Sequence, residues 1–145
     1  MNIAVSACLL GTRCRYDGGS KPCEAVIALR SRHTLVPICP EAMAGLPIPH
    51  PANEIVSASP LCVRDASGAD NTDAFVRGAE RALAHAQEKS CELAVLKAKS
   101  PSCGLGRVYD GTFTGTLVPG DGVAAALFKQ AGIPCVDEAH IPDGL

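Results

Sequence analysis

The chain has 145 residues, of which 47% are hydrophobic, only 3% are aromatic and none is tryptophan. A chain of this length can form one domain with a substantial buried core. Its formal net charge of −2 gives no sign of the clustered positive charge that extended nucleic-acid binding requires, so a small molecule is the expected partner.

Eight cysteines are the outlying feature of the composition. Residues 1–7 lack the cationic region and long apolar run of a secretion signal, and no apolar stretch reaches membrane-spanning length. We therefore expect a cytoplasmic protein with no membrane partner. In a reducing compartment, cysteines bind metal or take part in chemistry more often than they form disulfides. Cysteine is also a common core residue, so about half of the eight are expected in the core.

The predicted elements alternate along the chain. Short apolar runs predict strands at residues 3–7, 35–38, 62–65, 92–98 and 133–136. Apolar residues at three- and four-residue spacing predict helices at 21–31, 71–87 and 123–130. Prolines predict a rigid extended arm at 45–54, and Asp110-Gly111 predicts a hairpin turn. The alternation predicts an α/β protein with a three-layer, Rossmann-like fold and a small, mostly parallel sheet.

Three cysteines follow predicted strands. Cys8 comes directly after the first strand, Cys39 after the second, and Cys103 lies in a loop with proline and glycine after the strand at 92–98. Because the carboxyl ends of parallel strands share one edge, these thiols can meet there. Three thiolates suit a metal centre with an open position, and no CxxC pair supports a zinc ribbon or a thioredoxin-like site. On spacing alone, a metal site and incidental buried thiols are equal alternatives.

Longer blocks of the sequence carry a family resemblance. They are Ser6–Gly11, Cys14–Gly18, Cys39–Glu41, Gly45–Pro47, Ser100–Gly104, Tyr109–Gly115 and Gly120–Val123. Together they resemble the thiouracil desulfidase family over essentially the whole chain, which implies a single domain of this kind at residues 1–145. The resemblance implies a [4Fe–4S] cluster held by three cysteines. It also implies that the open fourth iron takes the sulfur of a thiolated uracil in a non-redox desulfuration.

Carried over to this sequence, the family pattern implies that Cys8, Cys39 and Cys103 are the cluster ligands. Soft thiolates stabilise iron–sulfur clusters, and an open iron is a soft Lewis acid for sulfur. With the sulfur bound to the open iron, water can add to the carbon that carries this sulfur, which gives uracil and sulfide. Cys14 belongs to the first blocks, so it is either an alternative ligand or a neighbouring thiol.

Four polar residues are candidates for the chemistry. Glu41 is the expected general base, with a surface or capping carboxylate as the alternative. Ser100 and Ser102 are candidates for holding the base or positioning water, and simple turn formation is an equal alternative. Asp17 either binds the substrate or forms the turn with Gly18.

The remaining candidates have weaker support. Arg15 and His50 are candidates for contact with a uracil carbonyl, with solvated loop residues as the alternative. The other four cysteines are expected in the core: Cys23, Cys62, Cys91 and Cys135.

Two other classes of function stay open: an iron–sulfur electron-transfer or cluster-carrier module, and a thiol-based redox sensor in which Cys8 and Cys14 form a reversible disulfide. The chain ends at Leu145, without the extra domain of some longer relatives of the family. A free thiolated base or nucleoside is therefore the expected partner, rather than tRNA.

Overall fold

A four-stranded parallel sheet forms the centre of the computed structural model, which describes residues 1–145. In spatial order its strands are β2 (Thr34–Ile38), β1 (Asn2–Ser6), β5 (Leu93–Leu96) and β8 (Cys135–Asp137). The central strands β1 and β5 are nearly continuous buried runs, as expected for strands covered on both faces. The short β8 lies at one edge of the sheet and begins two residues after the start of the strand predicted at 133–136.

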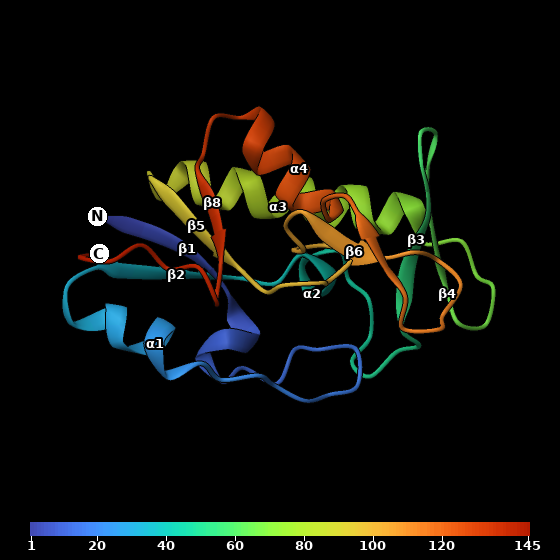
Figure 1. The fold of residues 1–145 in the computed structure, drawn as a ribbon, viewed down its shortest axis with the longest axis horizontal. Coiled ribbons are helices and arrows are strands. Elements are labelled where there is room, and N and C mark those ends of the chain that lie inside the picture. The colour runs from blue at the N-terminus through green and yellow to red at the C-terminus, as the bar shows by residue number, and fades with distance from the viewer.

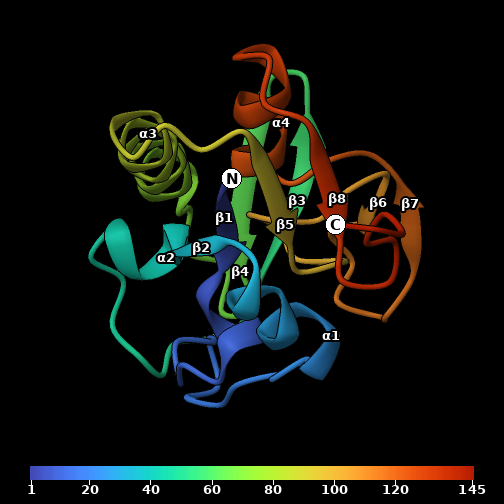
Figure 2. The same ribbon diagram turned by 90° about the vertical axis from the view of Figure 1, so that its left-hand side faces the viewer.

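Helices cover both faces of the sheet (Figures 1 and 2). Alternate strand residues such as Ala4 and Ala94 pack against α3 (Thr72–Glu88) and α4 (Val123–Gln130). The residues between them, such as Ile3, face the other side. There they meet the helices η1 (Ala7–Leu10), α1 (Glu24–Ile27) and η2 (Ala28–Ser31). The predicted three-layer α/β fold is confirmed.

Two antiparallel hairpins stand beyond the carboxyl ends of β1, β2 and β5 (Figure 1). One pairs β3 (Asn53–Ala58) with β4 (Leu61–Asp65), and the other pairs β6 (Arg107–Tyr109) with β7 (Leu117–Pro119). A separate core cluster, in which Val63, Phe75 and Val108 are almost fully buried, ties both hairpins to α3 and α4. The hairpins therefore form a wall opposite the strand ends.

Some elements differ from the sequence-based expectation. The extended arm predicted at 45–54 ends at residue 52, because Asn53 begins β3 and pairs with Asp65. The helix predicted from Lys21 begins at Glu24 and tightens into η2. A short helix, α2 (Pro40–Met43), directly follows Cys39, where no helix is predicted. None of the helices is both long and apolar enough to span a bilayer.

The turn after β4 supports a prediction about stability. Asp65 Oδ1 accepts hydrogen bonds from the Ser67 hydroxyl at 2.6 Å and from the backbone N–H groups of Ser67 and Ala69 at 2.9 and 3.0 Å. These bonds lower the pKa of Asp65 below its ordinary 3.8, so the ionised form stabilises the fold. Asp65→Asn should therefore lower the free energy of unfolding at pH 7.

The difference from the parent protein should shrink as pH falls below 3.8 through the lowered pKa, where Asp65 itself becomes neutral. Urea unfolding at a series of pH values measures this. The control is Asp143→Asn, at an exposed position near the C-terminus. A stability loss from Asp65→Asn that is the same at every pH would contradict the prediction.

Candidate functional site

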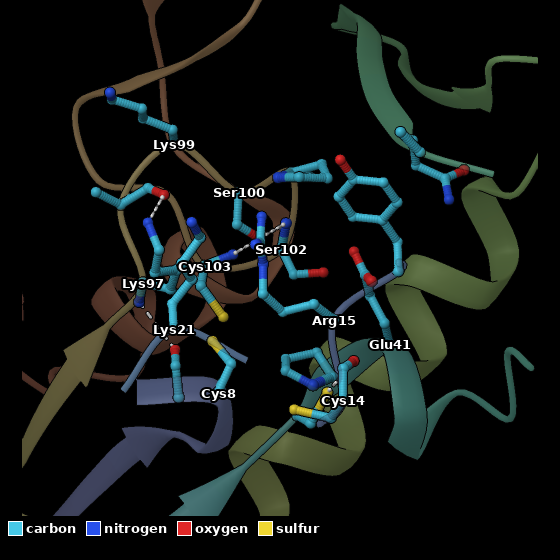
Figure 3. A pocket seen from close by; sticks show the side chains of 18 of the residues that line it. Cys8, Cys14, Arg15, Lys21, Glu41, Lys97, Lys99, Ser100, Ser102 and Cys103 are labelled. Carbon is cyan, nitrogen blue, oxygen red and sulfur yellow. Dashed lines mark hydrogen bonds between the residues drawn. The ribbon is translucent and has the colours of Figure 1, made fainter. Parts of the chain in front are cut away.

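The register of the sheet brings the predicted cysteines together at the carboxyl ends of the strands. Ser6 pairs with Ile38 across β1 and β2, so Cys8 in η1 and Cys39 at the start of α2 emerge beside each other. The loop after β5 returns Cys103 to the same place. Figure 3 shows the Cys8 and Cys103 thiols facing each other, with Cys14 nearby. All four thiols line a single cavity.

The cavity has a volume of about 610 Å³ and lies between the strand ends and the two hairpins. This is the size of a small-molecule site, and its position is where α/β sheets bind ligands. Two carboxylates line it, Glu41 and Glu54. It is also lined by four cationic residues, Arg15, Lys21, Lys97 and Lys99, and by three aromatic ones, Tyr16, Tyr109 and Phe113.

Ser100 holds the loop that carries Cys103. Its Oγ accepts hydrogen bonds from the backbone N–H groups of Ser102 and Cys103, each at 3.1 Å, and its carbonyl accepts one from Gly104 at 2.8 Å. The Ser100 hydroxyl is therefore engaged in forming the turn. Ser102 is only 3% exposed, lines the cavity, and has a buried hydroxyl with no hydrogen-bond partner. A buried unpartnered hydroxyl is costly, so Ser102 is the serine available for a ligand.

The start of α4 is hydrogen-bonded to the same loop. Val123 N–H donates to the Pro101 carbonyl and Ala124 N–H to the Ser102 carbonyl, both at 2.8 Å. At Gly122 a Cβ would lie 2.4 Å from the carbonyl carbon of Ser102 and 2.8 Å from the Cys103 nitrogen. Only glycine permits this close approach, so the start of α4 fixes the position of the loop that carries Cys103.

The cysteine thiols have different environments. Burial raises the pKa of Cys8 and of Cys103, and a hydrogen bond with Ser6 partly opposes this at Cys103. A hydrogen bond with the Cys14 thiol is the main cause that lowers the pKa of Cys39 to about 7, and the same contact raises the pKa of Cys14. The Cys39 Sγ also lies 3.6 Å from the Cys14 carbonyl oxygen.

Glu41 sits in the first turn of α2 with its side chain 14% exposed. Burial raises its pKa, while His50 and Arg15 oppose the rise. His50 Nε2 lies 3.3 Å from Glu41 Oε2, and Nδ1 lies 2.6 Å from the Pro47 carbonyl oxygen. His50 does not line the cavity but faces the carboxylate that does.

Helix α3 holds α2 in place. Arg77 Nη2 and Arg81 Nη1 donate to the carbonyls of Ala44 and Met43, at 2.9 and 2.6 Å. At Gly78 a Cβ would lie 2.0 Å from the Pro40 carbonyl oxygen, so the two helices are in backbone contact. These contacts fix the position of Glu41 relative to the thiols.

The structure separates the other predicted residues. Asp17 does not line the cavity: its Oδ1 accepts the Gly19 N–H at 2.9 Å, which favours the turn role. Arg15 does line it, and its guanidinium carbon lies 5.6 Å from the centroid of the Tyr16 ring. The cysteines outside the cavity lining are Cys23, Cys62, Cys91 and Cys135.

Sequence reasoning did not single out the residues that form the wall facing the thiols. Glu54 on β3 and Phe113 in the β6–β7 loop both line the cavity, although neither follows a strand of the central parallel sheet. Lys97 lines it too, with its Nζ 3.1 Å from Glu138 Oε2. Two signals pointed to this wall: the Tyr109–Gly115 block, through its match to the family pattern, and the proline-rich arm at 45–54, a candidate wall of the site. The contacts themselves join segments that are far apart in the sequence.

All eight cysteines are free thiols. No three ligating side chains converge closely enough to bind one metal ion. A [4Fe–4S] cube makes a different demand, because each cysteine binds a different iron and the sulfur atoms stay apart. Several thiols spread over the floor of one cavity fit that demand, and soft thiolates are the donor set such a cluster needs.

These features define a class: α/β proteins whose ligand cavity, at the carboxyl ends of a parallel sheet, has a floor of cysteine thiols. Within that class the sequence profile of the 2-thiouracil desulfurase family matches residues 3–140, and the chain belongs to this family. The resemblance read from the sequence blocks is confirmed.

Two related proteins extend the comparison. A solved structure of TudS, titled a [4Fe–4S]-dependent thiouracil desulfidase, superimposes with a TM-score of 0.87 at 41% identity, covering 98% of this chain and 93% of that one. The uncharacterised protein YbbK of Bacillus subtilis (strain 168) is 38% identical over 148 residues, covering 97% of this chain and 98% of YbbK.

Proposed function

We propose that this protein removes sulfur from a thiolated pyrimidine, such as 2- or 4-thiouracil or its nucleoside, with a [4Fe–4S] cluster held by Cys8, Cys39 and Cys103. The observation that carries the proposal is the convergence of these thiols on the floor of a cavity that Glu41 also lines. Family membership and the likeness to TudS support it. An electron carrier would have no use for a ligand-sized cavity above its cluster.

The charges around the site suit such a cluster. Burial raises the pKa values of Cys8 and Cys103 and so opposes the loss of their protons, but the four cations that line the cavity would offset the negative charge of the thiolates that form when iron binds. When bound, the cluster would supply an iron atom as a soft Lewis acid for the thiocarbonyl sulfur. The Cys14 carbonyl oxygen lies 3.6 Å from Cys39 Sγ, and Cys14 would orient that ligand.

The protein's own residues supply the remaining chemistry. Glu41, as the carboxylate, accepts a proton from the water that adds to the thiocarbonyl carbon. The buried Ser102 hydroxyl donates a hydrogen bond to a pyrimidine oxygen or to that water. The carbon–sulfur bond then breaks, so that thiouracil and water give uracil and hydrogen sulfide with no net change of oxidation state. Ser100 acts through the loop, and Asp17 has no role in this step.

The proposal is tested by anaerobic reconstitution with iron and sulfide, followed by incubation with 2- or 4-thiouracil and no electron donor. We expect loss of the thiocarbonyl absorbance, catalytic amounts of uracil and sulfide, and no change in the cluster's oxidation state by electron paramagnetic resonance. A fully loaded cluster that reduces and reoxidises but leaves both thiouracils intact would establish the carrier alternative instead. The protein is kept under reducing conditions throughout the test, because we propose that it acts in the reducing cytoplasm.

Gly122 gives a structural test of the cluster site. Gly122→Ala forces a methyl group into the Cys103 loop, so it should lower both stability, by about 1–3 kcal/mol, and the iron content after reconstitution. The control is Gly132→Ala, where a Cβ meets nothing within 4 Å although φ is +82°. The control should lose some stability through backbone strain but keep full iron loading. Normal iron loading in folded Gly122→Ala protein would show that cluster binding does not depend on the position of the Cys103 loop.

A further inference from the structure

The aromatic residues of this chain are divided between the core and the cavity. There are three phenylalanines and two tyrosines. Phe75 and Phe128 are buried in the core, at 2% and 0% exposed. The other three, Tyr16, Tyr109 and Phe113, all line the cavity above the thiols. Every aromatic ring outside the core is therefore placed at the site.

Phe113 and Tyr109 are the cavity rings without an aromatic or cationic neighbour, and of these two only Phe113 is exposed. The Tyr16 ring already has the Arg15 guanidinium 5.6 Å from its centroid and the His50 ring at 6.5 Å. Phe113 has neither an aromatic nor a cationic neighbour, and it is 37% exposed. An apolar ring left open beside a ligand cavity offers a flat face to an incoming ring.

A buried carboxylate holds Phe113 in an unusual backbone conformation. Its φ is +59°, in the left-handed region that bulky residues rarely adopt. Glu54, only 8% exposed, accepts hydrogen bonds at Oε1 from the backbone N–H of Gly111 at 2.9 Å and of Phe113 at 3.1 Å. Strain of this kind persists where the surroundings impose it, and such positions cluster at functional sites.

The rest of the β6–β7 loop is rigid. Its threonine hydroxyls form a chain, from Thr112 to Asp110 at 2.6 Å, from Thr112 to Thr114 at 2.6 Å and from Thr114 to Thr116 at 2.9 Å. Gly111 adopts a φ of +91°, and a Cβ there would lie 2.8 Å from Val56 Cα on β3. The loop backbone thus packs directly against β3 at Gly111, two residues before Phe113.

We infer that Phe113 is the stacking surface for the substrate ring and that Glu54 is its positioning residue. This inference rests on the proposed function and narrows the substrate class to planar, unsaturated heteroaromatic rings, since stacking requires a flat π face. Saturated rings and acyclic thioamides would lose this contact. Base–aromatic stacking typically changes binding by about 5- to 150-fold when the aromatic side chain is truncated.

The test uses uracil and 5,6-dihydrouracil, two ligands with no sulfur to remove, titrated by NMR against the reconstituted protein. The parent protein should bind the planar uracil more tightly than the puckered dihydro ring. Phe113→Ala should weaken uracil binding by about 5- to 150-fold and leave dihydrouracil within about twofold. Phe113→Tyr should restore the uracil affinity. Equal losses for both ligands, or none for uracil, would overturn the inference.

Two further variants test the positioning of the ring. Glu54→Leu, which removes the acceptor of both backbone N–H groups, and Gly111→Ala should reduce the preference for uracil over dihydrouracil while the iron content stays at the parent level. Gly68→Ala, with a similar φ of +93° and no neighbour within 4 Å, is the control and should keep the preference. Ring-selective binding that persists in a protein without desulfurase activity would refute the proposed function and leave this inference standing. Turnover without ring-selective binding would do the reverse.

Discussion

Cys103→Ala is expected to abolish cluster assembly and, with it, desulfuration. Cys103 is 4% exposed and reaches the cavity floor on a loop that Ser100 and the start of α4 hold rigid. No other residue of this loop can supply a thiolate. Loss of a residue that only supports a metal ligand costs about 10- to 100-fold in affinity or activity, so loss of a ligand should cost more.

The measurements are iron and sulfide content, the visible absorption of the cluster, and turnover of 4-thiouracil. Cys91→Ala is the matched control, because Cys91 is also buried, at 8% exposed, but lies away from the cavity. It should lose some stability and keep the cluster. Cys14→Ala should retain a cluster as well, since Cys14 is proposed to orient Cys39. A full cluster in Cys103→Ala but none in Cys14→Ala would exchange the two roles.

Glu41→Gln is expected to lower kcat by about 10²- to 10⁴-fold while the cluster and the binding of uracil are retained. The amide has nearly the same shape, so α2 keeps its contacts with α3, but it cannot accept a proton from water. Because burial raises the pKa of Glu41 above its ordinary 4.5, the acid limb of the parent's activity should lie above that value. Activity should rise with pH through this limb, as the carboxylate forms, and the limb should vanish in the variant.

The control for this variant is Glu24→Gln, an exposed carboxylate at the start of α1, which should leave kcat and its pH dependence unchanged. An unchanged kcat in Glu41→Gln, with the cluster in place, would remove Glu41 from the mechanism. A lost cluster in the same variant would instead show that Glu41 supports Cys39, two residues before it.

The parts of the fold with a strong local pattern could be predicted from the sequence. The amphipathic spacing of α3 predicted its bounds to within about one residue. The apolar runs of β1, β2 and β5 placed the cysteines at the carboxyl ends of these strands. The helix α2 carries no such pattern. It is one turn long, begins at Pro40, and is stabilised by Arg77 and Arg81 of α3, a helix that is distant in the sequence but packs against it.

The candidate site divides in the same way. Cys8 and Cys39 are placed by the strands that precede them, so their convergence follows from parallel pairing. Glu54 was expected in an extended arm, and its hydrogen bonds to Gly111 and Phe113 join residues more than 50 positions apart. No periodicity in a single sequence encodes such a contact. The ambiguity of Ser100 and Ser102 also needed coordinates, because only hydrogen-bond partners distinguish a hydroxyl that closes a turn from one free to bind a ligand.

The most direct measurement of the central claim is a mass-spectrometric one. The reconstituted protein is incubated anaerobically with 4-thiouracil in ¹⁸O-labelled water, and the products are analysed. We predict uracil that carries one ¹⁸O atom at C4, an equal amount of sulfide, and no conversion by protein without iron. Unchanged 4-thiouracil in the presence of a fully loaded cluster would contradict the proposed function, and uracil without ¹⁸O would contradict the addition of water that Glu41 is proposed to assist.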